Sequence, residues 1–230
     1  LDDVENVIWA HYVLGELNYM VGNFDKAIEH FKDGIKIVEE KRGKEKWRTS
    51  GHYTMLGTTY NLGYGDLDEA EDNCRKALEY GEMADDPFLM SYALVHYAFV
   101  CANRGDVEKA KELAERGLKL ARKVGNTGGI IQSFFALGCA NVIKGEHERS
   151  IEYLEEAKKL SDESGTHHGV AVWAEVYKAY SYLHSGDLEN AFQCLATSFE
   201  LATPPMKGMI YRIYGEAYSL KSPPEYDKAQ

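Results

Sequence analysis

Histidine and cysteine are the side chains here that most readily do chemistry, and their spacing does not form a metal site. The sequence has eight histidines and four cysteines, yet neither an H-E-x-x-H pair nor a Cys/His zinc spacing occurs. His167 and His168 are adjacent and could capture a stray metal ion, but a solvated loop is the simpler interpretation. The spacing therefore predicts no metal and no cofactor.

Motifs for nucleophilic and phosphate chemistry are also missing. There is no G-x-S-x-G elbow to present a serine, and no G-x-x-x-x-G-K loop to cradle a phosphate. The glycine-rich segment 125–129 follows a predicted helix and has no lysine after it, so we interpret it as a helix–helix turn. Carboxylate pairs such as Glu39–Glu40 and Glu155–Glu156 fall on predicted helix faces, where water solvates them. We therefore expect no enzymatic activity.

Composition narrows the class of protein further. The chain of 230 residues has a formal net charge of −11, which would repel a nucleic-acid backbone, and 44% hydrophobic residues, too many for a disordered chain. No apolar run reaches the roughly 20 residues that a membrane-spanning helix needs. We expect binding to neither nucleic acid nor membrane. The acidity is explained by solubility, with attraction of a basic partner as the alternative.

The cysteines indicate the cellular compartment of the protein, and the first residue indicates how the chain begins. The cysteines are widely spaced and form no C-x-x-C pair, as expected of small buried packing residues in a reducing, cytoplasmic compartment. They are Cys74, Cys101, Cys139 and Cys194. No basic and apolar leader opens the chain. The start at Leu1 instead of Met suggests an excised fragment or a processed start.

A glycine-centred repeat organises the sequence. A glycine, then Asp, Asn or Glu, then a larger residue recurs at steps of 43, 40, 40 and 41 residues. The five occurrences are Gly22-Asn23-Phe24, Gly65-Asp66-Leu67, Gly105-Asp106-Val107, Gly145-Glu146-His147 and Gly186-Asp187-Leu188. Glycine accepts the left-handed conformation that ends a helix, and the residue after it can cap the next helix. The pattern therefore predicts repeated helix–turn–helix units.

Small residues recur in register with these turns. One follows each turn, at Ala27, Ala70, Ala110, Ser150 and Ala191, and a second lies seven residues later, at Gly34, Ala77, Gly117, Ala157 and Ser198. A third precedes each turn, at Gly15, Gly57, Ala98, Gly138 and Ala179. Small side chains at these spacings keep one helix face shallow, so that two helices can pack closely. One hairpin cannot bury its apolar face alone, so we expect the hairpins to stack.

The predicted fold is an all-α, right-handed superhelix of about 11–12 antiparallel helices, without strands, in one continuous domain over residues 1–230. Repeats are predicted near residues 4–42, 46–84, 87–124, 128–163 and 169–202, with a partial repeat at 205–230. Pro224 would stand in the first turn of a twelfth helix. The open last hairpin would leave an edge for further sequence or for self-association.

Several motifs resemble tetratricopeptide repeats, over nearly the whole chain. They are Leu14-Gly15, Asn18, Tyr19, Gly22-Asn23-Phe24, Ala27 and Phe31, then Leu56-Gly57, Tyr60, Gly65 and Ala70, then Leu137-Gly138 and Gly145. The period of about 40 residues departs from the usual 34, and the closing proline is missing. This long-period form is similar to the arrays of bacterial ATP-driven transcription regulators, of kinesin-light-chain and cell-polarity adaptors, and of some nucleotide cyclases. The resemblance implies a docking or sensor module of a signalling protein.

In stacks of this family the first helix of each hairpin lines a concave surface, and counting back from the turn glycine selects the residues that would face a partner. They are Trp9, Tyr12, Glu16, Tyr19, Thr58, Asn61, Tyr92, Phe99, Asn103, Gln132, Phe135, Trp173, Tyr180 and His184. Aromatic and amide side chains are typical of recognition surfaces. The same rings could instead fill the interior of a tight superhelix. No cation or Asn stands where chaperone-binding arrays clamp a terminal carboxylate, which argues against that role.

Two functions follow from this reading. The favoured one is a non-enzymatic scaffold that binds a protein or peptide on the concave surface, and it predicts that Tyr12→Ala or Tyr180→Ala weakens binding without unfolding. The alternative is an effector-sensing domain of a larger signalling or transcription-regulating ATPase, which predicts an apolar pocket with a few polar groups.

Overall fold

The computed structural model describes residues 3–40 and 47–220, and every element in these ranges is helical. The elements are α1 (Asp3–Met20), α2 (Phe24–Glu40), α3 (Trp47–Thr59), the π-helical turn η1 (Tyr60–Tyr64), α4 (Leu67–Met83), α5 (Pro87–Arg104), α6 (Val107–Val124), α7 (Thr127–Lys144), α8 (His147–Ser164), α9 (His168–His184), α10 (Leu188–Leu201) and α11 (Pro204–Leu220). The all-α prediction is confirmed. The helix predicted at Pro224 lies outside the described residues.

The turn glycines have the predicted left-handed conformation. Gly22, Gly65, Gly105, Gly145 and Gly186 have φ values of 81°, 67°, 89°, 79° and 83°. In three of the following turns an aspartate caps the second helix, as when the Asp66 side chain accepts a hydrogen bond from the backbone N–H of Glu69. Glu146 makes no such bond, because its longer side chain fits the cap position less well. The predicted turn, a left-handed glycine followed by a capping residue, is therefore confirmed at most repeats.

The small residues lie at the closest helix contacts, as predicted. Ala27, Ala70, Ala110, Ser150 and Ala191 are each no more than 1% exposed. A Cβ added at Gly15 would lie 2.4 Å from the Phe31 ring, and one at Gly57 would lie 2.5 Å from the Cys74 sulfur and 3.0 Å from the Ala70 carbonyl oxygen. These approaches leave no room for a larger side chain. Packing of the hairpins therefore depends on the repeated small residues.

The first and second helices of a hairpin bury different amounts of their surface. The second helix α6 buries one stripe, formed by Ala110, Leu113, Ala114, Gly117 and Ala121. The first helix α5 buries nine residues on several sides, because α3, α4 and α6 all pack against it. Helix α5 is therefore an interior element, whereas the first helix α1 leaves Trp9, Leu14 and Leu17 exposed.

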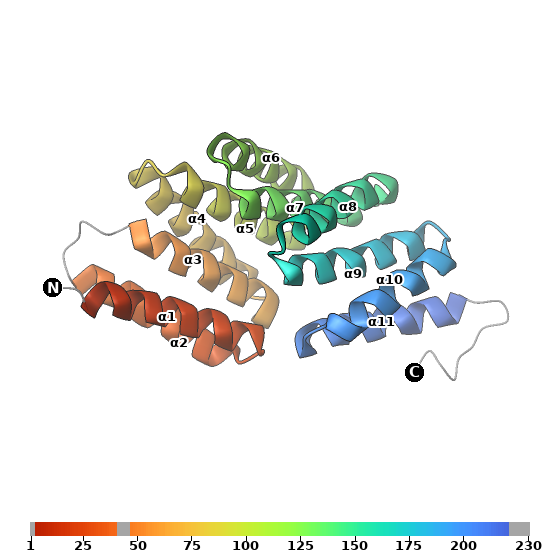
Figure 1. Ribbon diagram of the computed structural model, residues 1–230, viewed down its shortest axis with the longest axis horizontal. Helices are drawn as coiled ribbons and strands as arrows, with labels where there is room; N and C mark the ends of the chain where they lie inside the picture. Colours follow the sequence, from red (N-terminus) through yellow and green to blue (C-terminus); the bar gives the residue numbers. More distant parts are fainter. Residues whose placement is uncertain (1–2, 41–46, 221–230) are drawn as a thin grey trace. The chain divides into compact units, whose positions relative to one another are not determined.

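The chain forms two compact units, residues 1–129 and 130–230, divided within α7. In unit 1 the hairpins are α1 with α2, α3 with α4 and α5 with α6, and α3 contacts both α1 and α5 (Figure 1). Ala27, Phe31, Ile35 and Leu56 form a buried cluster across the first two hairpins. The single domain and the right-handed superhelix concern the arrangement of the whole chain and stay predictions.

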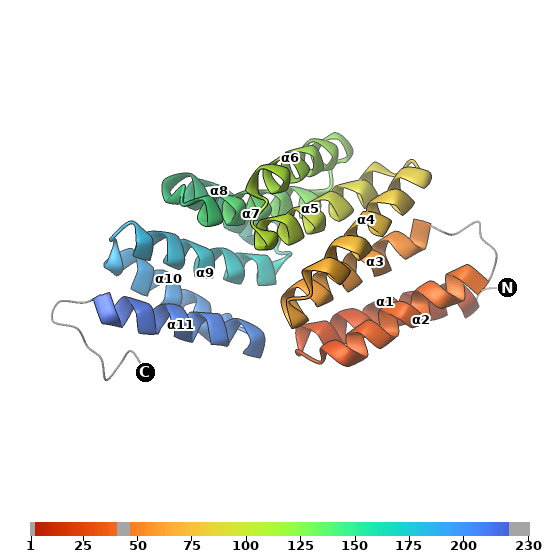
Figure 2. The same ribbon diagram turned by 180° about the vertical axis from the view of Figure 1, so that it is seen from behind.

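Unit 2 is built around α9. Helices α8, α10 and α11 all contact α9, and α10 also packs on α11 (Figure 2). The core contains Val176 and Leu183 of α9, Leu195 of α10, and Ile210 and Ile213 of α11. This core holds the first helix of the fifth repeat in place.

One element was not predicted, the π-helical turn η1 that ends the first helix of the second repeat. The backbone N–H groups of Gly65 and Asp66 both donate to the carbonyl of Tyr60. A π-turn accommodates one more residue than an α-turn. The first repeat step is 43 residues where the others are 40 or 41, so the one added residue accounts for part of that difference. Gly65 still closes the turn, so the surplus residue is absorbed before it.

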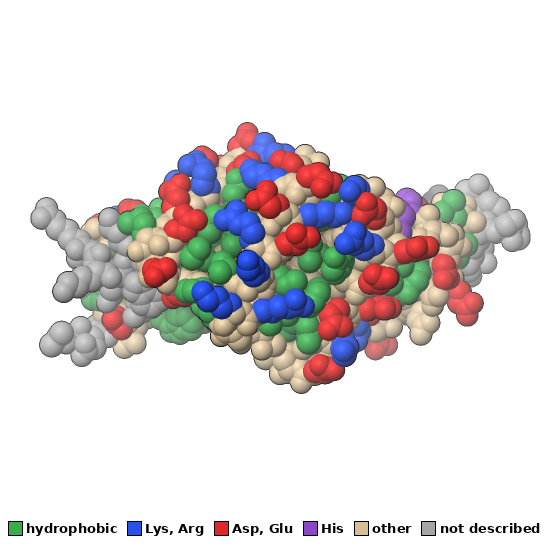
Figure 3. All heavy atoms as spheres, turned by 90° about the horizontal axis from the view of Figure 1, so that it is seen from above, with side chains coloured by type: hydrophobic (Ala, Val, Ile, Leu, Met, Phe, Trp, Pro, Cys, Tyr) green, Lys and Arg blue, Asp and Glu red, His purple; other side chains and the backbone are tan. Residues whose placement is uncertain are grey.

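The outward faces of the second helices are charged. Acidic and basic side chains are interspersed over the face shown in Figure 3, and exposed pairs such as Arg75–Asp72 and Arg116–Glu112 are 2.6 and 3.6 Å apart. Exposed pairs of this kind contribute little to stability. Over the described residues, no helix combines the length and apolar character required to cross a bilayer.

Candidate functional site

The residues predicted to face a partner lie on the first helices of both units. In unit 1 they come from α1, α3, η1 and α5, and we call this set with its neighbours the unit 1 surface. It comprises Trp9, Tyr12, Glu16, Tyr19, Gly51, Thr54, Thr58, Asn61, Phe88, Tyr92, His96, Phe99 and Asn103. Gln132, Phe135, Trp173, Tyr180 and His184 lie on α7 and α9 of unit 2.

Small side chains of α3 occupy the middle of the unit 1 surface. A Cβ added at Gly51 would lie 3.3 Å from the Tyr12 ring. Thr54 and Thr58 follow on the same helix face and are 5% and 9% exposed. Their hydroxyls donate to backbone carbonyls one turn earlier, at 2.9 Å each. Because these residues are short, larger side chains from the flanking helices α1 and α5 can interact across α3.

Tyr12 and Glu16 of α1 interact with Tyr92 of α5 across this gap. The Tyr12 hydroxyl donates a hydrogen bond to the Glu16 carboxylate. Tyr92 lies close enough to Glu16 that the negative charge of the carboxylate helps to raise the pKa of the Tyr92 phenol. Burial raises the pKa of the Glu16 carboxyl, and the bond from Tyr12 only partly opposes this. Burial also raises the pKa of Tyr12 and, less, that of Tyr92. The structure therefore brings together three of the predicted residues from two different repeats.

A row of rings continues along α5. Phe88 and Tyr92 have ring centroids 5.3 Å apart, Tyr92 stacks on His96 at 6.5 Å, and His96 lies 6.4 Å from Phe99. His96 Nδ1 is 2.7 Å from the Thr58 hydroxyl. Phe88 is 48% exposed, so the row begins at the solvent. Rings spaced in this way give a partner a rigid apolar face.

Amide side chains lie at the turn end of the unit 1 surface. Asn103 of α5 donates a hydrogen bond of 2.8 Å from Nδ2 to the Oδ1 atom of Asn61 in η1. Asn61 is 6% exposed, whereas Asn103 is exposed. The π-helical turn thus places Asn61 where it accepts a hydrogen bond from Asn103, and both residues belong to the predicted set.

Trp9 and Tyr19 of α1 differ in accessibility. Trp9 is 61% exposed and stacks on Tyr12 with ring centroids 5.4 Å apart. Tyr19 instead packs beside Phe24 at 5.9 Å, and burial raises the pKa of its hydroxyl to about 12. Tyr12 also contacts Phe31, at a centroid distance of 6.2 Å. Trp9 is therefore free to meet a partner, while Tyr19 and much of Tyr12 serve the core.

In unit 2 the predicted ring of Phe135 is buried. Phe135 of α7 is 7% exposed and meets Tyr177 of α9 edge to face at 5.7 Å. Trp173 lies 6.1 Å from the same Tyr177, whose pKa is raised by burial. The Oε1 atom of Gln132 is buried, and no described residue donates a hydrogen bond to it. The interior-filling interpretation thus fits Phe135, and Gln132 offers one polar atom beside it.

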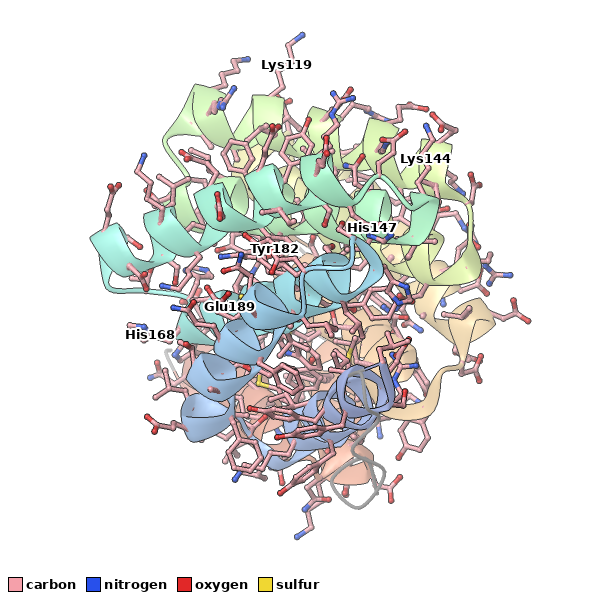
Figure 4. All side chains as sticks on the ribbon, turned by 90° about the vertical axis from the view of Figure 1, so that its right-hand side faces the viewer. Lys119, Lys144, His147, His168, Tyr182 and Glu189 are labelled. Carbon is pink, nitrogen blue, oxygen red and sulfur yellow. The ribbon has the colours of Figure 1, made fainter. Side chains whose placement is uncertain are left out.

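The other end of α9 carries a second ring group. Tyr180 and His184 have centroids 4.2 Å apart, and His184 stacks on His147 at 5.6 Å. Figure 4 labels His147 at the start of α8. His184 Nε2 is 3.5 Å from the Glu216 carboxylate of α11. Burial and the neighbouring His184 lower the pKa of His147, so a neutral ring is favoured there.

The sequence reasoning missed Phe88, His96, Tyr177 and His147. His96 and Phe88 lie one helical turn on either side of the predicted Tyr92, so extending the count by four residues would have found them. Tyr177 stands in the same relation to the predicted Trp173. His147 had no such signal, because it is on a second helix and meets His184 only through tertiary packing.

The described side chains include potential metal ligands and thiols. No group of three potential metal ligands occurs among them. All four cysteines are free and buried, as predicted. Burial raises the pKa of Cys101 to about 11 and that of Cys194 to about 12, so these thiols are poor nucleophiles at neutral pH.

Comparison with known proteins identifies the repeat. Residues 89–163 match the model of the tetratricopeptide repeat family. The photosystem I assembly protein Ycf3 of Acaryochloris marina is 28% identical over 142 residues, which cover 60% of this chain and 76% of that protein.

Solved structures show the same fold at low identity. A Rap protein complexed with Competence and Sporulation Factor aligns with a TM-score of 0.75 and 15% identity over 90% of this chain and 57% of that one. A signal transduction ATPase with a tetratricopeptide repeat sensor, from Pyrococcus horikoshii, aligns with a TM-score of 0.61 and 21% identity over 94% of this chain and 32% of that one. The chain thus corresponds to about half of the first structure and a third of the second.

Proposed function

The chain is a tetratricopeptide-like helical-repeat protein, and from that premise we propose that it is a non-enzymatic scaffold that binds a protein or peptide on the first-helix surfaces of its repeats. One observation carries the proposal: the unit 1 surface presents exposed rings at both flanks of the short side chains of α3. Trp9 is 61% exposed on α1 and Phe88 is 48% exposed on α5. Such rings beside buried polar groups suit recognition of a peptide.

A random-peptide display selection against the whole chain tests this function. We expect enriched sequences, and we expect Trp9→Ala to weaken their binding about tenfold, as the loss of an aromatic anchor does. Thermal denaturation of Trp9→Ala should match that of the parent chain. Substitution of an exposed outer-face residue, Glu115→Gln, is the control and should leave binding unchanged. A selection without enrichment would contradict the proposal.

The sequence-derived test with Tyr12→Ala needs correction. Tyr12 packs on Phe31 and lies 5.4 Å from the His52 ring, so its truncation would remove core contacts and confuse unfolding with lost binding. Trp9 stacks on the outer side of Tyr12 and avoids this difficulty.

A sensor role within a larger switch protein is the second candidate. It is supported by the likeness to an ATPase with a tetratricopeptide repeat sensor, and to a Rap protein that was solved in complex with Competence and Sporulation Factor. Under this role a small molecule would raise the melting temperature of the chain. Screening metabolites by thermal shift, with no protein partner present, separates the two candidates.

The remaining expectations also stay proposals. A reducing, cytoplasmic setting is supported by four free, buried cysteines. Direct nucleic-acid binding is disfavoured by the net charge of −11. Self-association through the C-terminal edge would involve residues after Leu220, which lie outside the described part of the chain, and analytical ultracentrifugation would test it.

A further inference from the structure

We infer that the unit 1 surface binds a cationic side chain, arginine or lysine, of its partner at the Glu16 carboxylate beside Tyr12 and Tyr92. The inference rests on the proposed function and adds the chemistry of the partner. The Glu16 carboxylate lies on the first helix α1 among aromatic rings. A charged side chain is usually found in water and not in such a position.

A second carboxylate of the same unit shows what such a site looks like when it is filled. Glu71 of α4 accepts hydrogen bonds from the Tyr97 hydroxyl at 2.6 Å and from Lys109 Nζ at 2.9 Å. Arg104 Nε lies 3.3 Å from its other oxygen. Lys109 Nζ also lies 4.7 Å from the centre of the Tyr97 ring. A carboxylate, a tyrosine and cations thus form one closed group, and the pKa of Glu71 is lowered.

Glu16 has the carboxylate and the tyrosine of that group but not the cation. Within residues 3–40 and 47–220, its side chain accepts a hydrogen bond from Tyr12 and forms no ion pair. A carboxylate offers about four acceptor positions, so most of its capacity remains after the bond from Tyr12. Burial without a cation raises the pKa of Glu16, opposite to the direction at Glu71. An incoming cation would supply the partner that Lys109 and Arg104 supply to Glu71.

The surroundings of Glu16 favour a cation over other donors. The rings of Tyr12, Trp9 and Tyr92 lie on the same surface, and aromatic faces attract ammonium and guanidinium groups. The α3 residues opposite are Gly51, Thr54 and Thr58, which are short enough to admit a long side chain. The net charge of −11 would draw a basic segment toward the protein from a distance.

The experiment uses the random-peptide selection on the whole chain and examines which side chains recur. The inference expects a lysine or arginine at one fixed position of the enriched peptides. Replacing that residue by a neutral isostere, citrulline for arginine or acetyl-lysine for lysine, should weaken binding about tenfold in calorimetry. This arm changes only the peptide, so it does not depend on the folding of a protein variant.

The protein arm uses Glu16→Gln, which keeps the size and the acceptor for Tyr12 but removes the charge. The affinity of Glu16→Gln for the enriched peptide should fall by about the same factor as the affinity of the parent chain for the neutral peptide. Combining the variant with the neutral peptide should weaken binding no more than either change alone. Glu115→Gln on the exposed face of α6 carries the same net charge and should bind like the parent chain. Circular dichroism checks the fold of both variants.

Each other result overturns the inference in a distinguishable way. Enriched peptides without a fixed cation, or full binding by Glu16→Gln, would overturn the cation site and leave the scaffold function standing. Equal losses in Glu16→Gln and Glu115→Gln would show general attraction to an acidic protein and overturn the site as well. No enriched peptide at all would overturn both the function and the site.

Discussion

Glu71 and Glu16 are two partly buried carboxylates of unit 1, and they differ in how far the fold itself satisfies them. Glu71 lies where α4, α5 and α6 meet, and Tyr97, Lys109 and Arg104 surround it. Glu16 lies on the unit 1 surface, and among the residues that the structure describes it has a tyrosine but no cation as a partner. The comparison teaches that a carboxylate at the junction of three helices is paired with cations by the fold, whereas Glu16 on the unit 1 surface meets no cation among the described residues.

The largest effect we expect comes from breaking the packing on which both carboxylates depend. Gly57→Val should lower the free energy of unfolding by about 3 kcal/mol, because its Cβ would meet Cys74 and the Ala70 carbonyl. Gly208→Ala is the control, since an added Cβ there meets nothing within 4 Å and alanine favours the helix by about 0.5–1 kcal/mol. Urea denaturation measures both. Similar stability of the two variants would refute the close-packing account.

The next largest effect should come from removing the Lys109 cation that pairs with Glu71. Lys109→Met should lower the free energy of unfolding at pH 7 by about 1 kcal/mol, a modest value because the lysine side chain is 39% exposed. The pKa of Glu71 is lowered in the folded state, so its contribution exists above the ordinary carboxyl range and is lost as the pH falls through the folded pKa. The difference between the variant and the parent should therefore shrink in acid. A constant difference from pH 7 to pH 3 would contradict this.

Glu16→Gln should raise the stability of the protein at pH 7, whereas Lys109→Met lowers it. The pKa of Glu16 is raised in the folded state, so its contribution is present below the unfolded value of about 4.3 and is lost as the pH rises through the folded pKa. The glutamine variant should therefore melt at a higher temperature than the parent at pH 7 and match it near pH 4. Melting curves at the two pH values test the sign. A destabilised variant at pH 7 would remove the contrast with Glu71.

Trp9→Ala should have the smallest effect on stability. The indole is 61% exposed, so we expect a change within about 0.5 kcal/mol in urea denaturation. Tyr12→Ala, one turn further along α1, should cost at least about 2 kcal/mol because its ring packs on Phe31. Equal losses in the two variants would mean that Trp9 belongs to the core and not to the surface.

Local rules were enough to predict the elements and their limits. The turn glycine and the capping aspartate act within a few residues of each other, as at Gly105 and Asp106, so their pattern is visible in one dimension. The π-helical turn η1 was missed, although the repeat step that ends at Gly65 is the longest of the four. Its form depends on how the chain closes on Gly65, which the count alone does not specify.

The surface residues were predicted in position but not in environment. Counting back from the turns selected both Trp9 and Phe135, yet one is 61% and the other 7% exposed. The count assigns the helix face but does not include the side chains that other helices bring against it. Tyr177, which covers Phe135, lies 42 residues away in the sequence.

The sequence by itself determined the helices, their turns and the small residues at which they pack, because each depends on neighbours within one or two helical turns. Tertiary structure decided which carboxylate received a cation. Lys109 and Arg104 reach Glu71 from later helices, whereas the hydrogen-bond partner of Glu16 within the described ranges is Tyr12, one turn before it. Charge pairing across helices depends on distances in space, and a linear pattern does not contain them.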